Sequence, residues 1–152
     1  MTDVLKLSVS EFELFLHKRI PITKAMGITV LEYSEAAVKV KAPLALNFNH
    51  KGTAFGGSIN TLMTVCGWAQ THALISAHDA QAHIFIQKSK VRYRAPIISD
   101  FIAECSMNDS AAVKLFLDSY FRYGKAKIDI AVKCMDGEKI LAEFEAGYVV
   151  FK

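Results

Sequence analysis

The sequence has few cysteines, no long apolar run and little net charge, and each shortage excludes a class of protein. Cys66, Cys105 and Cys134 are odd in number and widely spaced, so neither a disulfide framework nor a cysteine zinc site is expected. No stretch approaches the roughly 20 apolar residues that cross a bilayer. The start, MTDVLKLSVSEFELF, lacks the apolar run of a signal peptide. We therefore expect a cytoplasmic protein with reduced thiols and no membrane partner.

The composition is that of a globular chain without an excess of basic charge. A net charge of +3 is too small to predict nucleic-acid binding. The residues are 52% hydrophobic and 22% charged, which is typical of a packed core and not of disorder. The 152 residues contain no repeat, linker or low-complexity tract. We predict one domain over residues 1–152.

Hydrophobic periodicity predicts a helix, two strands, a long helix and four further strands. Ser8 or Ser10 can cap the first helix, with Ser10 and Glu13 at capping-box spacing, and Pro21 should end it at Ile20. A short helix is expected from Asp109–Ser110 to near Gly124. Strands are expected over residues 28–33, 37–42, 82–94, 100–107, 125–135 and 138–151.

The long helix, residues 57–77, dominates the predicted fold. Its apolar residues repeat with helical period over about five turns, or about 30 Å. It contains no Asp or Glu, and a helix this apolar is expected to be buried on nearly all sides. One buried helix among segregated strands predicts an α+β fold, with the helix packed on an antiparallel sheet.

The segment NFNHKGTAFGGS, residues 47–58, leads into this helix. A helix N-terminus presents N–H groups without helical partners and about half a positive charge. Gly56 and Gly57 leave those groups accessible to a ligand oxygen. A thioester carbonyl bound there would have its oxyanion stabilised, and one such donor lowers a barrier by on the order of 3 kcal/mol. The alternative is that the glycines only make a tight junction between loop and helix.

Polar side chains near this helix start also have two interpretations. Asn47, Asn49 and His50 can orient a water or a carbonyl, and His50 can act as a base near neutral pH. They can equally bond the loop backbone. Asn60 and Thr64 lie one helical turn apart and can line a pocket, unless Thr64 bonds back to its own helix.

These residues resemble a known family. The run N-x-x-G-T-x-(H/F)-G-G-S, a long helix, and a strand ending in Y-x-x-P are similar to hot-dog-fold thioesterases. The block I-Q-K-S at residues 86–89 further resembles the YiiD-type C-terminal putative thioesterase domain. The likeness covers roughly residues 15–151. The matching residues are Asn49, Gly52, Thr53, Phe55, Gly56, Gly57, Ser58, Tyr93 and Pro96.

The resemblance implies a hot-dog fold, in which a curved antiparallel sheet wraps the long helix and two protomers complete each active site. It implies hydrolysis of thioesters of coenzyme A or acyl carrier protein, without a cofactor. By this resemblance Asn49 would hold the carbonyl or the water. The N–H groups of Gly56 and Gly57 would form the oxyanion hole.

Two residues depart from the pattern of the resemblance. Phe55 stands where many relatives have histidine, and Thr64 stands where many have an Asp or Glu that acts as base or nucleophile. Because Thr64 cannot accept a proton unaided at neutral pH, His50 or Asn60 would share that work. The alternative function is a hot-dog protein that binds acyl chains or acyl carriers with little catalysis.

The segment QKSKVRYRAP adds basic residues to the prediction. With period two, Lys88, Lys90, Arg92 and Arg94 share one face of a strand, and Gln87 and Ser89 would face the pocket. The cations can grip coenzyme A phosphates or an acidic carrier protein, or they can simply be solvated. Aromatic residues do not alternate with them on their face, which disfavours nucleic acid. The predicted substrate-binding residues are Asn47, Phe55, Asn60, Gln87, Lys88, Ser89 and Arg92.

Other reaction classes are disfavoured. A dehydratase or hydratase pairs a histidine with a helix carboxylate, which residues 57–77 lack. His72, His78 and His83 are spaced by six and five residues, which fits no compact ligand set, so no metal is expected. A six-stranded sheet this apolar is expected to need a partner, as a dimer or tetramer.

Overall fold

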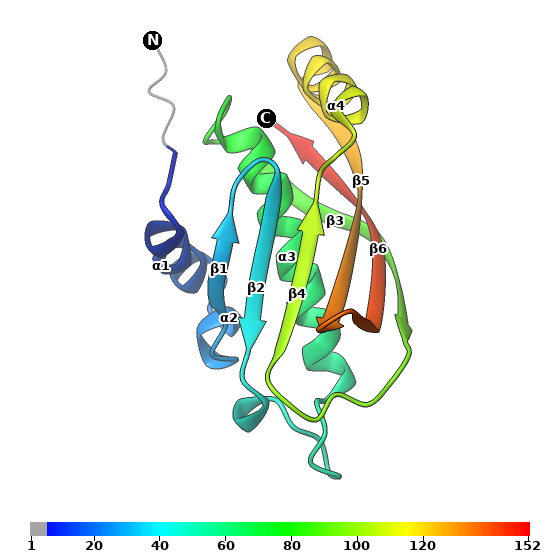
Figure 1. Ribbon diagram of the computed structural model, residues 1–152. Coiled ribbons are helices and arrows are strands. Elements are labelled where there is room, and N and C mark those ends of the chain that lie inside the picture. Colours follow the sequence, from blue (N-terminus) through cyan, green and yellow to red (C-terminus); the bar gives the residue numbers. More distant parts are fainter. Residues whose placement is uncertain (1–5) are drawn as a thin grey trace.

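The computed structural model describes residues 6–152 and has one curved sheet around one long helix (Figure 1). All six strands are antiparallel to their neighbours, in the order β1-β2-β4-β5-β6-β3. The α+β arrangement predicted from the sequence is therefore confirmed. The elements are α1 (Val9–Arg19), α2 (Ile22–Ala25), β1 (Thr29–Tyr33), β2 (Ala37–Ala42), a 3-10 turn η1 (Leu44–Leu46), α3 (Gly56–Ser76), β3 (His83–Tyr93), β4 (Phe101–Ser106), α4 (Ser110–Tyr123), β5 (Lys125–Asp136) and β6 (Lys139–Phe151).

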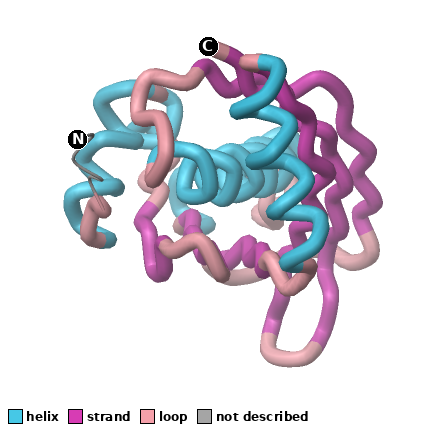
Figure 2. The backbone as a smooth tube through the Cα atoms, turned by 90° about the horizontal axis from the view of Figure 1, so that it is seen from above, coloured by secondary structure: helices cyan, strands magenta, loops and turns pink. Residues whose placement is uncertain are grey.

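The central helix α3 lies along the concave face of the sheet, with the strands curving around it (Figure 2). In β5 buried and exposed residues alternate over nearly the whole strand, as expected for a sheet with one face on the core. Tyr148 of β6 is fully buried, and its hydroxyl donates to the carbonyl of Thr64 at 2.7 Å. A Cβ at Gly67 would lie 2.5 Å from that hydroxyl oxygen, so this glycine permits the close approach of helix and sheet.

Helix α1 covers the free edge of β1. Glu13 Oε1 accepts from the N–H of Val30 at 2.7 Å, and His17 Nε2 lies 2.7 Å from the carbonyl oxygen of Ile28. Because β1 is the last strand on its side of the sheet, these backbone groups have no neighbouring strand to bond. Two side chains of α1 therefore occupy positions that another strand would take.

The start of α1 corrects one prediction. The capping box predicted at Ser10 and Glu13 is wrong: Ser8 Oγ accepts from the Glu11 N–H at 3.2 Å, and Glu11 Oε1 accepts from the Ser8 N–H at 3.1 Å. Both pairs have the same spacing, but Glu13 is engaged by the backbone of Val30. Helix α1 ends at Arg19, directly before the predicted stop at Ile20.

The insertion helix α4 stands beyond the ends of β4 and β5 in Figure 1 and packs on β5. Asp109 caps it by accepting from the Ala112 N–H at 3.0 Å, and Gly124 ends it with φ +70°. Tyr120 donates to Asp79 at 2.5 Å, which ties α4 to the turn after α3. No helix within residues 6–152 is long and apolar enough to cross a membrane.

Candidate active site at the start of the central helix

The loop before α3 is organised by its two asparagines. Asn49 Oδ1 accepts from the N–H groups of Lys51 at 2.9 Å and Thr53 at 3.2 Å, and its Nδ2 donates to Thr53 Oγ1 at 2.8 Å. This is a side-chain turn of the kind that asparagine favours. Asn49 therefore folds the loop, and one Nδ2 hydrogen stays available to a ligand.

Asn47 anchors the loop to the rest of the fold. It is buried, and its Nδ2 donates to the carbonyls of Met26 at 2.9 Å and Pro43 at 2.8 Å. Its backbone carbonyl accepts from the N–H of Phe55 at 2.7 Å. Because both side-chain amide hydrogens and the backbone carbonyl are hydrogen-bonded, Asn47 fixes the place where α3 begins.

The N-terminus of α3 has unpaired backbone donors. Phe55 precedes the helix in extended conformation, no side chain caps the first turn, and no acidic residue lies in it. The first helical hydrogen bond runs from Ile59 N–H to the Phe55 carbonyl at 3.0 Å. Within residues 6–152 the N–H groups of Gly56, Gly57 and Ser58 therefore stay without a partner. They form a site for a carbonyl oxygen or an anion.

Two aromatic rings flank these donors. A Cβ at Gly57 would lie 2.6 Å from Cε1 of Phe55, and one at Gly56 would lie 3.7 Å from the ring of Tyr93. Phe55 is 56% exposed and Tyr93 52% exposed. The glycines thus sit between two half-exposed rings, with Phe55 against Gly57 and Tyr93 against Gly56.

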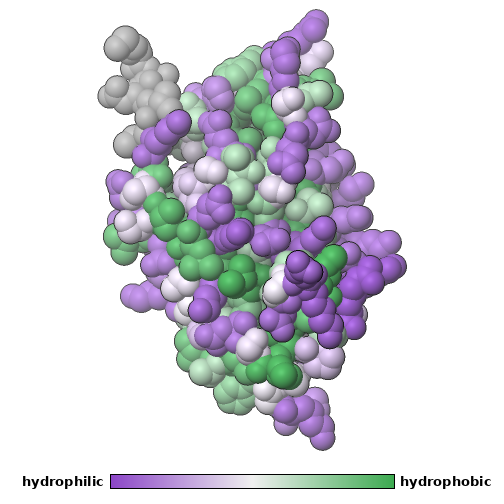
Figure 3. Space-filling model, in the orientation of Figure 1, coloured by the Kyte–Doolittle hydropathy of each residue, from purple (hydrophilic) through white to green (hydrophobic). Residues whose placement is uncertain are grey.

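The surface around the helix start is apolar. Leu46, Phe48 and Ile98 are each more than 60% exposed. Phe48 pairs with Ala54, whose N–H donates to the Ile97 carbonyl at 2.8 Å, so the two loops lie together. Figure 3 shows apolar residues gathering at this lower end of the molecule. We call Leu46, Phe48, Phe55 and Ile98 the apolar rim.

Further along α3, the polar side chains bond within the helix. The hydroxyl of Thr64 donates to the carbonyl of Asn60 at 2.8 Å, which is the back-bonding alternative noted from the sequence. The lone pairs of Thr64 Oγ1 are left to accept from a water. His50 lies exposed in the loop at the start of the helix.

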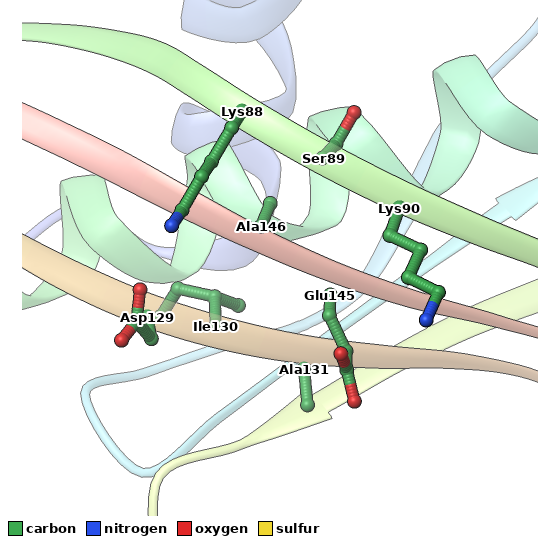
Figure 4. Close-up of a pocket in the computed structure, with 8 residues that line it drawn as sticks. All are labelled: Lys88, Ser89, Lys90, Asp129, Ile130, Ala131, Glu145 and Ala146. Carbon is green, nitrogen blue, oxygen red and sulfur yellow. The ribbon is translucent and has the colours of Figure 1, made fainter.

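The predicted residues of β3 are divided between the two sheet faces. Ser89 pairs with buried Ala146, whereas Lys88 and Arg92 pair with Gly147 and Glu143 on the outer face. Figure 4 shows Ser89 pointing to the opposite side from Lys88 and Lys90. Gln87 falls in a β-bulge between Ile86 and Lys88 and has no partner in the register, a feature that strict alternation did not predict.

On the outer face, Lys90 and Arg92 of β3 and the following Arg94 lie opposite carboxylates, whereas Lys88 is in register with Gly147. Arg94 makes a 2.7 Å ion pair with Glu143, and Lys90 is in register with Glu145. The register continues across the sheet as one row of alternating sign, formed by Glu32, Lys39, Glu104, Lys133, Glu143 and Arg92. The structure therefore does not bring Lys88 and Arg92 together with the glycine loop.

Five sizeable clefts of the single chain lie away from the helix start. Five clefts of about 250 to 560 Å³ lie on the described part of the chain, and residues 47–58 line none of these five. The cleft of about 540 Å³ in Figure 4 lies among Lys88, Asp129 and Glu145, where small residues separate charged ones. It belongs to the outer sheet face, not to the face that holds α3.

The chain matches the family described as the putative thioesterase domain of the YiiD C-terminus over residues 9–152. It belongs to this family. A solved structure described as a putative thioesterase is similar to this chain over nearly its whole length. A putative thioesterase from Shewanella oneidensis is 28% identical, with a TM-score of 0.83 over 95% of this chain and 97% of the other.

More distant structures share the fold. A probable thioesterase from Pseudomonas aeruginosa has a TM-score of 0.81 at 22% identity, over 97% of this chain and 98% of the other. A thioesterase from Haemophilus influenzae has a TM-score of 0.74 at 10% identity, over 100% and 96%. The hot-dog fold implied by the sequence is confirmed, and the YiiD-type family implies an acyl thioester as substrate in general.

Proposed function

We propose that this chain hydrolyses acyl thioesters of coenzyme A or acyl carrier protein, with the thioester carbonyl bound by the Gly56 and Gly57 N–H groups. The observation that carries the proposal is the uncapped start of α3, where three backbone donors have no partner within residues 6–152. A family that acts on thioesters supplies the substrate class. Donors aimed at a developing oxyanion are worth about 10²–10³ in rate each.

The chemistry needs a water and a route for its proton. Water attacks the carbonyl carbon, the carbonyl electrons move to the oxygen held by the amides, and collapse of this intermediate expels the thiolate. His50 is the candidate base that takes the proton of the water and returns it to the sulfur. Thr64 and Asn60 orient the water, and Asn49 offers its remaining Nδ2 hydrogen to the carbonyl or the water.

The acyl group is assigned to the apolar rim. These exposed side chains come from the loop before α3 and from the loop that meets it, and they offer apolar contact to a hydrocarbon chain. Phe55 lies against Gly57 and so contacts the carbons next to the carbonyl. Ser89 is retained as a substrate contact on the inner side of β3, and Gln87 is retained as a contact from the neighbouring bulge. Lys88 and Arg92 are retained only for the polar end of the substrate or for a carrier protein.

A second protomer is part of the proposal. The β1 edge of the sheet is occupied by Glu13 and His17, whereas β3 forms the other edge over 11 residues. The inner side of β3 is also partly uncovered, since Ile86 is 41% and Tyr93 52% exposed. Pairing of β3 with the same strand of a second copy would join two sheets. Because Tyr93 at the end of β3 contacts Gly56, this strand pairing would also enclose the start of α3.

The test is release of free thiol from a chain-length series of acyl-CoA and acyl carrier protein thioesters. We expect hydrolysis well above the buffer rate with at least one substrate. His50→Ala, Asn49→Ala and Thr64→Ala should lower kcat, with His50→Ala the most severe at about 10²-fold or more. Hydrolysis at the buffer rate throughout the series would end the proposal.

Acyl binding without turnover is the second candidate. Two observations favour it: α3 has no Asp or Glu, and the Thr64 hydroxyl is already bonded to Asn60. The same series separates the two, because a binding protein would show saturable acyl-CoA binding by calorimetry with thiol release at the buffer rate. A measurable rate that survives Thr64→Ala would show that this hydroxyl is dispensable.

A further inference from the structure

Tyr93 connects the edge strand to the start of the central helix. It is the last residue of β3, and pairing with buried Ala142 of β6 fixes its backbone. Its hydroxyl donates to the carbonyl oxygen of Gly56 at 3.0 Å, and its ring lies against the same glycine. The side chain is 52% exposed, so water could satisfy the hydroxyl equally well.

The bonded carbonyl is one end of the peptide group that joins Gly56 to Gly57. The other end of that planar group is the Gly57 N–H, one of the donors without a partner. A hydrogen bond to the carbonyl polarises the whole peptide group and strengthens the N–H as a donor. It also restrains the rotation of the peptide plane, and glycines on both sides make such restraint more important.

We propose that Tyr93 is a positioning residue for the oxyanion hole, acting through the Gly56–Gly57 peptide group. This inference rests on the proposed function, because it assigns the Gly57 N–H to the thioester oxygen. Tyr93 does not touch the reacting atoms. It orients and polarises a donor that does, and it couples that donor to the strand expected to pair with a second copy.

The test is Tyr93→Phe, which removes one hydroxyl and keeps the ring against Gly56. We expect kcat on the best acyl-CoA to fall about tenfold, less than the 10²–10³ lost with a donor itself. KM should stay within about twofold, because the effect belongs to the transition state. The matched control is Tyr123→Phe, at the end of α4, where the tyrosine is 70% exposed and far from the glycines in sequence.

A second readout excludes a merely structural role. A trifluoromethyl ketone analogue of acyl-CoA forms a tetrahedral adduct, whereas a thioether analogue resembles only the substrate. Tyr93→Phe should weaken binding of the ketone by the same factor as kcat and leave binding of the thioether unchanged. Equal weakening of both analogues, or a large drop in the thermal midpoint, would overturn the positioning role.

The outcomes separate the two proposals. If the unchanged protein hydrolyses thioesters and Tyr93→Phe matches it in kcat and in ketone binding, the role of Tyr93 is wrong and the proposed function stands. If the unchanged protein releases no thiol from any substrate, both proposals fall together.

Discussion

At Gly57 and Gly67 of α3 an added Cβ would crowd an aromatic ring, and the two rings differ in their freedom to move. At Gly67 an added Cβ would meet Tyr148, which is fully buried and held by its bond to Thr64. At Gly57 it would meet Phe55, whose ring is 56% exposed and can rotate away. Crowding by these two rings therefore predicts opposite effects on stability when Gly67 and Gly57 are each replaced by alanine.

Gly67→Ala should destabilise the protein and Gly57→Ala should not. Overpacking against a fixed ring costs about 1–3 kcal/mol, which outweighs the roughly 1 kcal/mol that alanine gains over glycine in a helix. Urea unfolding should show a lower midpoint for Gly67→Ala and an unchanged or higher one for Gly57→Ala. A lower midpoint for both variants would mean that Phe55 is as firmly held as Tyr148.

His72 makes a pH-dependent contribution to stability. It is buried among Phe12, Phe15 and Trp68, and its Nδ1 lies 2.6 Å from the hydroxyl of Tyr33. Burial lowers the pKa of His72 to about 4, from 6.5 in the unfolded chain. Between these pH values the unfolded chain binds one more proton than the folded chain. The contribution of neutral His72 to the free energy of unfolding is therefore fully present above pH 6.5 and is lost as the pH drops toward 4.

The expected loss over that window is about 3 kcal/mol. Denaturant unfolding at several pH values should show it, and His72→Gln, which does not titrate, should show much less. NMR titration of the His72 ring gives an independent measure, because the ring should stay neutral until about pH 4. A ring that titrates near pH 6.5 would contradict the assignment.

At the scale of residues, the sequence predicted which residues lie near the start of α3 better than it predicted their hydrogen-bond partners. It placed Asn47 and Asn49 in the loop, but Asn47 bonds Met26 and Pro43, which only the folded chain brings near. Tyr93 was part of the recognised pattern, yet nothing in a strand pattern shows that its hydroxyl reaches Gly56. Side-chain partners depend on tertiary distances that periodicity does not contain.

At the scale of elements, α1 protects one edge of the sheet. The positions that a further strand would bond are taken by Glu13 on the Val30 N–H and by His17 on the Ile28 carbonyl. Removing both side chains by Glu13→Ala with His17→Ala leaves β1 exposed. An exposed edge strand pairs readily with other chains.

We expect that double variant to form larger assemblies than the unchanged protein, as measured by size-exclusion chromatography with light scattering. The control is Glu11→Ala, which removes the capping box of the same helix but leaves the edge bonds intact. It should lower stability slightly, because Ser8 still caps the helix, and leave assembly unchanged. An unaltered elution profile for the double variant would show that α1 covers β1 by bulk alone.

Element boundaries were predicted to within about a residue where hydrophobic periodicity and the capping or helix-ending residues agree, as in α3 and α4. The misses have physical causes. The short helix α2 has only four residues, too few for a period to show. The capping box was ambiguous because Ser8 and Ser10 each precede a glutamate by three residues. The bulge at Gln87 arises from strand pairing and leaves no local signal.

At the scale of the whole molecule, the open edge of β3 predicts a dimer. Because residues 47–58 line none of the five clefts described above, the second copy is expected to complete the site. The resemblance implied such pairing, but composition and periodicity carried no information on it. We therefore expect the pocket to form only when two chains pair.

Dilution tests this expectation. Below the dissociation constant of the dimer, activity per chain should fall, and amides of β3 should exchange faster with deuterium while those of β1 do not change. Light scattering on the same samples should report two chains at high concentration. Constant activity per chain in samples shown to be monomeric would contradict the shared site.

The most direct test of the central claim changes one backbone donor. Phe55 has φ −66° and ψ 132°, the conformation preferred before proline, and Gly56 is the first helical residue, where proline is favoured. Gly56→Pro should therefore preserve the helix while deleting the N–H of residue 56. Gly56→Ala keeps this N–H, and its Cβ would make only ordinary contact with Tyr93. We predict that kcat for thioester hydrolysis falls about 10²–10³-fold in Gly56→Pro and stays close to the unchanged protein in Gly56→Ala. Equal kcat values for the two variants would contradict the claim that this amide holds the thioester oxygen.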